Sequence, residues 1–206
     1  MDDFTQRMQS AYNQVAHIYA KSNASMPDVL VERMDQFLSQ IDENACVLDL
    51  ACGAGRDLNC LMNKKVKSFG ADLSWEMLRQ TRLQTQAPLL QTNMLQLGFK
   101  SEAFAGIWCS AAMLHLPKDL IGQALLEVHR VLMAGGWFYV AVQGGEGEGW
   151  ESGSYDETVE RFFARYEADE FADILTQNGF RVVHRGVNES STRRWIHFLC
   201  QRGERC

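Results

Sequence analysis

Short apolar runs alternate with amphipathic stretches along most of the chain, at spacings that distinguish strands from helices. The apolar runs predict strands at residues 46–51, 66–73, 87–93, 104–111 and 137–143. The amphipathic stretches predict helices over 55–62, 74–86 and 118–136, the second capped by Ser74 and the third closed by Gly135 and Gly136. This alternation favours a doubly wound α/β fold, in which helices cover both faces of a mostly parallel sheet.

The two ends of the chain add elements to this core. Helical patterns at residues 2–20 and 28–40 predict a cap over 1–42, ahead of a core at 43–142. The glycine-rich, acidic residues 144–155 predict a mobile loop, and a helix over 168–178 follows. Two final strand candidates, "FRVVHRG" and "WIHFLCQR", predict an antiparallel hairpin at the sheet edge. We therefore expect one domain, with 143–206 forming a loop, a helix and the terminal hairpin.

The charge and cysteine content narrow the possible partners and location. The formal net charge is -6 and the pI about 5.4, which disfavours binding to a phosphate backbone. No signal peptide or run of membrane-spanning length is present in this sequence. The six cysteines, Cys206 included, are dispersed and form no CxxC pair for a metal such as zinc. We expect reduced thiols, no metal and a cytoplasmic location.

A glycine turn follows the first predicted strand in "VLDLACGAGRD", residues 47–57. Gly53 and Gly55 allow close approach by a ligand, but Leu58 stands where a dinucleotide fingerprint needs its third glycine. No Lys-Ser or Lys-Thr pair follows, so a phosphate loop is excluded. Asp57 in the next turn is either a helix-dipole partner or a ligand contact, and Arg56 either meets a ligand carboxylate or lies on the surface.

Two acids point to a ligand without a pyrophosphate. Asp49 precedes the turn, where a carboxylate suits an amine, although a helix cap or a solvated acid is the plainer alternative. Asp72 ends the second predicted strand, where an acid can accept hydrogen bonds from both ribose hydroxyls. A ribose and an amine without a phosphate site describe S-adenosylmethionine.

With these motifs, the sequence resembles a class I S-adenosylmethionine-dependent methyltransferase. "VLDLACGAGRD" is similar to the first motif of that family and "GADLSWEML" to its acidic second motif. "QTNMLQLGF", "FAGIWCSAAMLHLP" and "LLEVHRVLMAGGWFYVAV" are similar to later segments in the same order. The resemblance implies a seven-stranded sheet with six parallel strands and the last strand inserted antiparallel. It also implies S-adenosyl-L-methionine as cofactor and S-adenosyl-L-homocysteine as its product.

The resemblance assigns cofactor contacts position by position. Asp49 and the backbone from Ala51 through Gly53 to Gly55 hold the methionine portion, and Asp72 holds the ribose. Leu73 and Met94 flank the adenine, while backbone near Ser110 and Ala111 faces the amino group. The family acid that meets the adenine amino group is Asn93 here, a neutral and weaker acceptor, by roughly 1 kcal/mol.

The methyl acceptor and the catalytic groups are less constrained. Proximity and alignment supply much of the acceleration of an in-line methyl transfer, so a base is optional. His115 is the candidate base, with turn formation as the alternative. Tyr12 and Tyr19 lie in a segment similar to one that covers the family cofactor, although simple packing also explains them.

Substrate contacts are expected from the segments after the core. Trp150 and Tyr155 can stack on a flat acceptor, and Arg193 can bind an acidic one. The plainer alternatives are a solvated acidic loop and charge protection of an edge strand. The leading hypothesis is a methyltransferase for a small molecule, with oligomeric state unpredicted. The alternatives are a noncatalytic cofactor-binding module acting through a partner, a methyltransferase for a modified tRNA base and, disfavoured by Leu58, a nicotinamide oxidoreductase.

Overall fold

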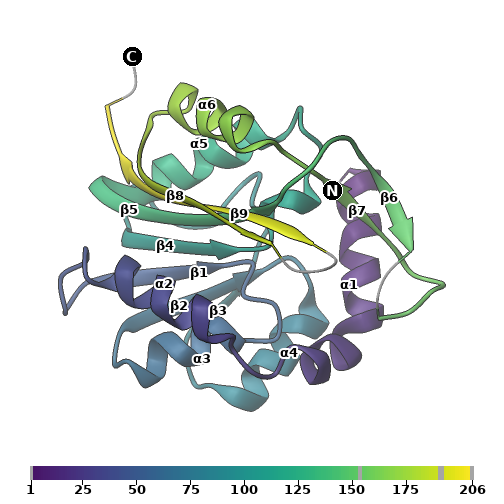
Figure 1. The fold of residues 1–206 in the computed structure, drawn as a ribbon. Helices are drawn as coiled ribbons and strands as arrows, with labels where there is room; N and C mark the ends of the chain where they lie inside the picture. The colour runs from purple at the N-terminus through teal and green to yellow at the C-terminus, as the bar shows by residue number, and fades with distance from the viewer. Residues whose placement is uncertain (1, 153–154, 190–192, 205–206) are drawn as a thin grey trace.

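A seven-stranded sheet forms the centre of the computed structural model, which describes residues 2–152, 155–189 and 193–204 (Figure 1). Its strands are Cys46–Leu50 (β1), Lys67–Asp72 (β2), Leu89–Gln91 (β3), Phe104–Ser110 (β4), Leu132–Gln143 (β5), Phe180–Glu189 (β8) and Arg194–Arg202 (β9). They are ordered β3-β2-β1-β4-β5-β9-β8, and only the pairings of β9 are antiparallel. The predicted doubly wound sheet, with its last strand inserted antiparallel, is confirmed.

Helices cover both faces of this sheet, which explains why its central strands are apolar throughout. The helices Asp28–Leu38 (α2) and Arg56–Asn63 (α3) pack on one face, and Ile121–Val131 (α5) and Ala168–Gln177 (α6) on the other (Figure 1). In β1, Val47, Leu48 and Leu50 are all buried. Because both sides of such a strand meet side chains, its sequence shows no alternation.

The N-terminal helix covers the carboxyl end of the sheet. Asp3–Ser22 (α1) runs across the strand ends in Figure 1 and contacts Trp75–Gln84 (α4). Asp2 caps α1 by accepting from the backbone N–H of Thr5 at 2.8 Å, and Ser74 caps α4 by accepting from that of Met77 at 3.1 Å. The cap predicted at Ser74 is confirmed, and Asp2, predicted only as the first residue of a helical stretch, caps α1.

The predicted end of the long helix is wrong. α5 ends at Val131, and the glycines expected to close it, Gly135 and Gly136, lie inside β5. Gly135 has a φ of +70°, and the pairing of β4 with β5 shifts register beside it, between Phe104 and Gly106. The glycines therefore bend the chain as it enters the regular part of β5.

The predicted mobile loop over 144–155 is also corrected in part. Glu148–Ser152 (β6) pairs antiparallel with Glu160–Ala164 (β7), and this two-stranded β6–β7 sheet lies outside α1 (Figure 1). Its polar sequence concealed a strand because one face carries Trp150 and Phe162 toward α1 while charged residues surround them. Arg7 of α1 pairs with Glu160 at 2.6 Å, which fixes the β6–β7 sheet to the helix.

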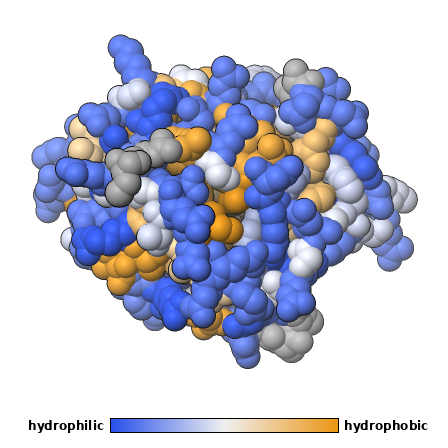
Figure 2. All heavy atoms as spheres, turned by 90° about the horizontal axis from the view of Figure 1, so that it is seen from above, coloured by the Kyte–Doolittle hydropathy of each residue, from blue (hydrophilic) through white to orange (hydrophobic). Residues whose placement is uncertain are grey.

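Hydrophilic residues cover most of the face seen in Figure 2, with hydrophobic residues between them. Among the described residues, no helix is long and apolar enough to span a membrane. Within the same ranges, no group of three or more His, Cys, Asp or Glu side chains is arranged to hold a metal. The cysteines of the described chain are free thiols, and Cys206 lies outside the described residues.

Candidate functional site

The site lies at the carboxyl ends of β1, β2 and β4, where ligands bind in open α/β sheets. At two of these ends a non-glycine residue adopts the left-handed conformation: Ala51 after β1 and Ala111 after β4, each with a φ of +57°. Such residues cost of order 1–3 kcal/mol and cluster at ligand sites. Both alanines line cavities, so the strain shapes their walls.

Three adjoining cavities open at this edge. The first cavity has mostly apolar walls and runs between α1 and the ends of β1, β2 and β4. The residues predicted from the sequence that line this cavity are Tyr12, Tyr19, Ala51, Gly53, Asp72, Leu73, Asn93, Met94, Ser110, Ala111 and His115. Met8 and Phe4 of α1 and Leu116 complete one end. The elongated apolar lining, with a few polar groups, suits a flat nucleoside.

Asp72 occupies the end of β2 as predicted for a ribose contact. One carboxylate oxygen accepts from the backbone N–H of Gly53 and the other from that of Ser74, both at 2.8 Å. Burial raises the pKa of Asp72 to about 6, against the opposing effect of these hydrogen bonds. Each oxygen retains acceptor capacity, so the carboxylate can position the turn and receive hydroxyl hydrogens.

The two glycines of the turn have different roles. Gly53, at a φ of +55°, lines the first cavity, and a Cβ there would meet the Tyr19 ring at 3.5 Å. Gly55, at +89°, lines none of the three cavities, although its neighbours Ala54 and Arg56 line the third, and its predicted ligand contact stays a prediction. A Cβ on Gly55 would lie 2.7 Å from the Thr81 side chain, so this glycine permits α3 and α4 to pack closely.

The third cavity is small, polar and bordered by Asp49. Asp49 is 2% exposed, and its Oδ2 has no hydrogen-bond partner. Burial raises the pKa of Asp49 well above its usual value, and the nearby Asp57 and Asp72 add to the rise while Arg56 opposes it. A buried carboxylate oxygen without a donor beside a cavity fits an ammonium group, as predicted for Asp49.

Arg56 and Asp57 also border the third cavity. The guanidinium of Arg56 donates to Asp57 at 2.6 Å, and the other Asp57 oxygen accepts from the Trp108 indole N–H at 2.8 Å. Asp57 therefore joins α3 to β4 and holds Arg56. These contacts support a structural role for Asp57 rather than a contact with a ligand. Arg56 lines two of the cavities with its side chain 24% exposed, and its contact with a ligand carboxylate stays a prediction.

The second cavity lies between α1, α2, the end of β5 and the β6–β7 sheet. It shares the walls formed by Tyr12, Tyr19, Ser110, Ala111 and His115 with the first cavity. Tyr19 and Ser110 border all three cavities, which therefore meet beside these two side chains. Two ligands placed in the first and second cavities would approach each other at this junction.

Tyr12 and His115 form a hydrogen-bonded pair in the shared wall. His115 Nδ1 lies 2.6 Å from the Phe162 carbonyl oxygen, so it carries the proton and donates. Its Nε2 then accepts from the Tyr12 hydroxyl at 2.5 Å. Burial lowers the pKa of His115 to about 4 and raises that of Tyr12 to about 12. His115 shapes the turn, as one interpretation predicted, and also orients a hydroxyl at the cavity.

Asn93 lies in the first cavity but its amide oxygen is engaged. It accepts from the backbone N–H of Leu95 at 2.9 Å, while the amide nitrogen lies 3.5 Å from the Thr5 hydroxyl. Leu73 and Met94 line the same cavity, on the side expected for a base. The asparagine therefore stabilises its own loop and leaves one lone pair for a ligand.

Trp150 does not line any of the three cavities, so its predicted stacking on a substrate is not supported. It lies opposite Phe162 in the β6–β7 ladder, and directly opposed side chains share a face. That face packs on α1, where the Trp150 ring contacts Phe4 and lies 3.6 Å from the Arg7 guanidinium carbon. Trp150 therefore holds the β6–β7 sheet in place.

The other predicted substrate residues do reach the second cavity. Tyr155 lines it, and its hydroxyl accepts from the Asn23 side chain at 2.9 Å. Arg193, just before β9, lines it as well. The nearby acids Glu148 and Glu151 do not line it, since they bond to the Lys118 backbone N–H and to Arg165.

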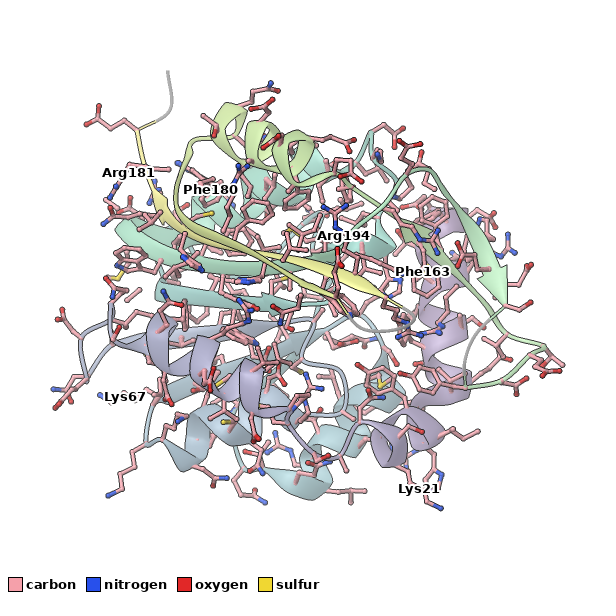
Figure 3. All side chains as sticks on the ribbon, viewed as in Figure 1. Lys21, Lys67, Phe163, Phe180, Arg181 and Arg194 are labelled. Atoms are coloured by element: carbon pink, nitrogen blue, oxygen red, sulfur yellow. The ribbon has the colours of Figure 1, made fainter. Side chains whose placement is uncertain are left out.

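The sequence interpretation missed several residues of the second cavity. Arg161 and Phe163 of β7 point into it from alternate positions, and Figure 3 shows Phe163 where β7 passes the end of the sheet. The sequence "ERFFA" has two charged residues followed by three apolar ones, so it carries no alternation that could have identified them. Arg33 of α2 contacts His197 of β9, and both residues line the cavity.

The family and sequence comparisons agree with this architecture. Residues 47–136 match the model of a methyltransferase domain family. An uncharacterized protein of Methanocaldococcus jannaschii is 32% identical over 132 residues, which make up 64% of this chain. The chain spans about half of that relative, since the match covers 49% of its length.

Solved structures show the same fold at low sequence identity. One is a chain from the complex between the Haloferax volcanii Trm112 methyltransferase activator and a putative methyltransferase. It is 19% identical, with a TM-score of 0.73 over 97% of this chain and 99% of that one. Another is Burkholderia thailandensis 1,6-didemethyltoxoflavin-N1-methyltransferase, with bound 1,6-didemethyltoxoflavin and S-adenosylhomocysteine. It is 16% identical, with a TM-score of 0.66 and coverage of 95% and 80%.

The fold and the adjoining cavities define a Rossmann-like α/β protein with a nucleoside-type site at the carboxyl edge of its sheet. Residues 47–136 match a methyltransferase domain family, and the solved structures that share this fold include proteins described as S-adenosylmethionine-dependent methyltransferases. The cofactor of that family is S-adenosyl-L-methionine.

Proposed function

We propose that this chain is a methyltransferase that binds S-adenosylmethionine and transfers its methyl group to a small molecule in the second cavity. One observation carries the proposal: the nucleoside-type cavity and the second cavity share a wall made by Tyr12, Tyr19, Ser110, Ala111 and His115. When bound, the cofactor supplies an electrophilic methyl carbon, whose bond to sulfur breaks as the acceptor atom bonds to it, with S-adenosylhomocysteine remaining.

The chain's own residues fit the cofactor. Asp72 suits the ribose hydroxyls, and Leu73 and Met94 suit the two faces of the base. The unpartnered oxygen of Asp49 suits the ammonium group, and Arg56 across the third cavity suits the carboxylate. These assignments need no pyrophosphate site, which agrees with Leu58 in place of a third glycine.

Tyr12 and His115 support the transfer from the shared wall. We propose that the Tyr12 hydroxyl contacts the acceptor and that His115 acts through it, as a positioning residue and proton acceptor. If the acceptor atom carries a proton, that proton passes to the Tyr12 oxygen while the Tyr12 proton passes to Nε2. The low pKa of His115 makes it a weak base, so alignment supplies most of the rate.

The test compares cofactors and follows turnover. Calorimetry with S-adenosylmethionine, S-adenosylhomocysteine and NAD is expected to show binding of the first two only. NAD binding without a response to either methionine compound would refute the proposal. Turnover is then followed as S-adenosylhomocysteine formed in the presence of a panel of small acceptors.

A second candidate is a cofactor-binding module that acts through a protein partner. Its support is the similarity to a chain from a complex in which a putative methyltransferase is joined to an activator. This candidate predicts binding of S-adenosylhomocysteine but no turnover by the isolated chain. A methyltransferase for a tRNA base predicts turnover with tRNA alone.

A further inference from the structure

Arg161 is a buried cation at the wall of the second cavity. The residue is 5% exposed, and its Nε has no hydrogen-bond partner. Across the described ranges, none of the ion pairs involves Arg161. A buried guanidinium costs several kcal/mol in lost hydration unless an anion or full hydrogen bonding compensates it.

Tyr12 and aromatic rings provide part of that compensation, since the Arg161 side chain is hydrogen-bonded to Tyr12. The Arg161 guanidinium carbon lies 4.8 Å from the ring centre of Tyr155, 5.1 Å from that of Phe163 and 5.7 Å from that of Tyr12. Each such contact contributes about 0.5–2 kcal/mol. The Nε–H still lacks a hydrogen-bond acceptor, and an anionic oxygen would supply one.

The acid opposite Arg161 in the β6–β7 ladder is bound elsewhere. Glu151 lies opposite Arg161 in the β6–β7 ladder, which places both side chains on one face. The Glu151 carboxylate instead forms two hydrogen bonds with Arg165, at 2.6 and 2.8 Å. Arg165 thereby keeps this carboxylate away from Arg161 and from the cavity.

The described residues that line the second cavity include arginines but no acids. Four arginines line it, namely Arg33, Arg56, Arg161 and Arg193, and its described lining contains no Asp or Glu. The protein as a whole carries a net charge of -6, so this concentration of positive charge opposes the overall balance. Arg56 is paired with Asp57, but Arg33 bonds to the neutral Asn188 and His197. The cavity is therefore electropositive.

We propose that the second cavity takes an anionic aromatic molecule, whose anionic oxygens Arg161 binds while Tyr155 and Phe163 contact its ring. A carboxylate matches the planar fork of a guanidinium best, and an aryl phosphate carries the same kind of oxygen. This proposal rests on the proposed function, because it assigns the class of methyl acceptor. Tyr12 lies beside Arg161, so an acid held there is also beside the hydroxyl proposed to meet the acceptor atom.

The test measures binding of benzoate, its neutral isostere benzamide and phenyl phosphate by calorimetry to protein saturated with S-adenosylhomocysteine. We expect the wild type to bind benzoate at least about tenfold more tightly than benzamide. Arg161→Gln should reduce that ratio below about twofold while changing the affinity for S-adenosylhomocysteine less than about threefold. Arg161→Met, which keeps the length of the stem, should behave in the same way and guards against a folding defect in the first variant.

The matched control is Arg7→Gln, because Arg7 contacts the opposite face of the β6–β7 sheet and lines none of the three cavities. It should retain the preference for benzoate. Equal binding of benzoate and benzamide by the wild type, or no binding of either, overturns the proposal. The proposal is also overturned if both Arg161 variants retain the preference for benzoate over benzamide. If the wild type binds phenyl phosphate more tightly than benzoate, the anionic group of the proposed ligand is a phosphate rather than a carboxylate.

Two further outcomes separate this proposal from the proposed function. If the Arg161 variants lose S-adenosylhomocysteine, the guanidinium serves the cofactor carboxylate and the acceptor assignment is overturned. If the wild type does not bind S-adenosylhomocysteine, the proposed function fails, and the benzoate and benzamide comparison is made on the cofactor-free protein. A preference that persists there retains the anion site without the methyl transfer.

Discussion

At the residue scale, Asp49 combines an unfavourable burial with a proposed binding role. Because its folded pKa is raised above the unfolded value, its ionisation destabilises the fold as the pH rises from about 4. We expect Asp49→Asn to raise the Tm of the cofactor-free protein at pH 7.5 by about 2–4 °C, the effect of about 1 kcal/mol. The same variant should bind S-adenosylhomocysteine at least about tenfold more weakly. Lower stability together with unchanged binding would contradict both roles.

The affinity for S-adenosylhomocysteine should depend on pH through Asp72. The pKa of about 6 means that the carboxyl is increasingly protonated below pH 6, where it accepts ribose hydrogens poorly. Affinity should therefore rise with pH from 5 to about 7, approaching tenfold per unit below 6. Calorimetry across this range checks the slope, and a flat profile would argue against a contact with the ionised carboxylate.

The simpler variant Asp72→Ala is expected to cost most of the cofactor affinity. Sequence reasoning predicts that the fold stays intact, but the carboxylate also accepts from the backbone of Gly53 and Ser74. Loss of both acceptors should lower the free energy of unfolding by about 1–3 kcal/mol. Affinity and thermal unfolding should be measured together, and unchanged affinity would refute the ribose contact.

Asn93→Asp tests the position where the chain departs from the family pattern. The carboxylate can still accept from Leu95, and its charge strengthens an acceptor bond to the adenine amino group. We expect unchanged or improved affinity for S-adenosylhomocysteine in calorimetry. Strong weakening would place Asn93 outside the adenine contact.

Tyr12 and His115 should act as one unit. Tyr12→Phe and His115→Gln are each expected to lower kcat by about 100-fold, the lower end for a proton-transfer group, with little change in cofactor affinity. The double variant should lose little more than either single variant, since both remove the same hydrogen bond. Additive losses would show that the two residues act independently.

Residues close to a recognisable turn were predictable, and residues brought in by distant elements were not. Asp49, Asp72 and Ser110 lie in the last two residues of apolar strands, so strand ends alone suggested their common edge. Arg161 and His197 reach the second cavity only because β7 and β9 fold back toward α1 and α2, and no local spacing records that approach. Their chemistry therefore emerged from the tertiary structure.

At the element scale, the turn between β1 and α3 depends on its packing against α4. Gly55→Ala should lower the free energy of unfolding by about 1–3 kcal/mol, because Gly55 has a positive φ and its added Cβ would meet Thr81. Gly149→Ala in β6 is the control: nothing lies within 4 Å of its added Cβ, and a change below about 0.5 kcal/mol is expected. Chemical denaturation compares the two, and equal effects would contradict the packing role.

The main helices and strands could be predicted because their apolar periodicity and their capping residues indicated the same boundaries. The strand over 148–152 was missed because glycines and glutamates mask an alternation that matters only once Trp150 packs on α1. The end of α5 was misplaced because Gly135 and Gly136 carry the usual helix-stop signal, although the chain uses them to enter β5. Glycine marks a change of backbone direction without specifying which element it belongs to.

At the scale of the whole molecule, charge is distributed unevenly. The surplus of acids lies outside the second cavity, and arginines line its wall. The global balance led to the expectation that polyanionic nucleic acids are disfavoured, which stays a prediction. A single small anion meets a local field of the opposite sign, so the average charge of the chain says little about the ligand of this cavity.

The β6–β7 sheet is attached to the core in a way that bears on how such proteins diversify. The chain leaves β5 at Gln143 and returns at Tyr166, whose backbone N–H donates to the Gln143 carbonyl at 3.1 Å. The two ends of the segment that contains β6 and β7 therefore lie side by side. A segment of different length or composition can replace it without moving the strands that hold Asp49 and Asp72. The proposed acceptor cavity, which this segment borders, can thus change during evolution independently of the proposed cofactor site.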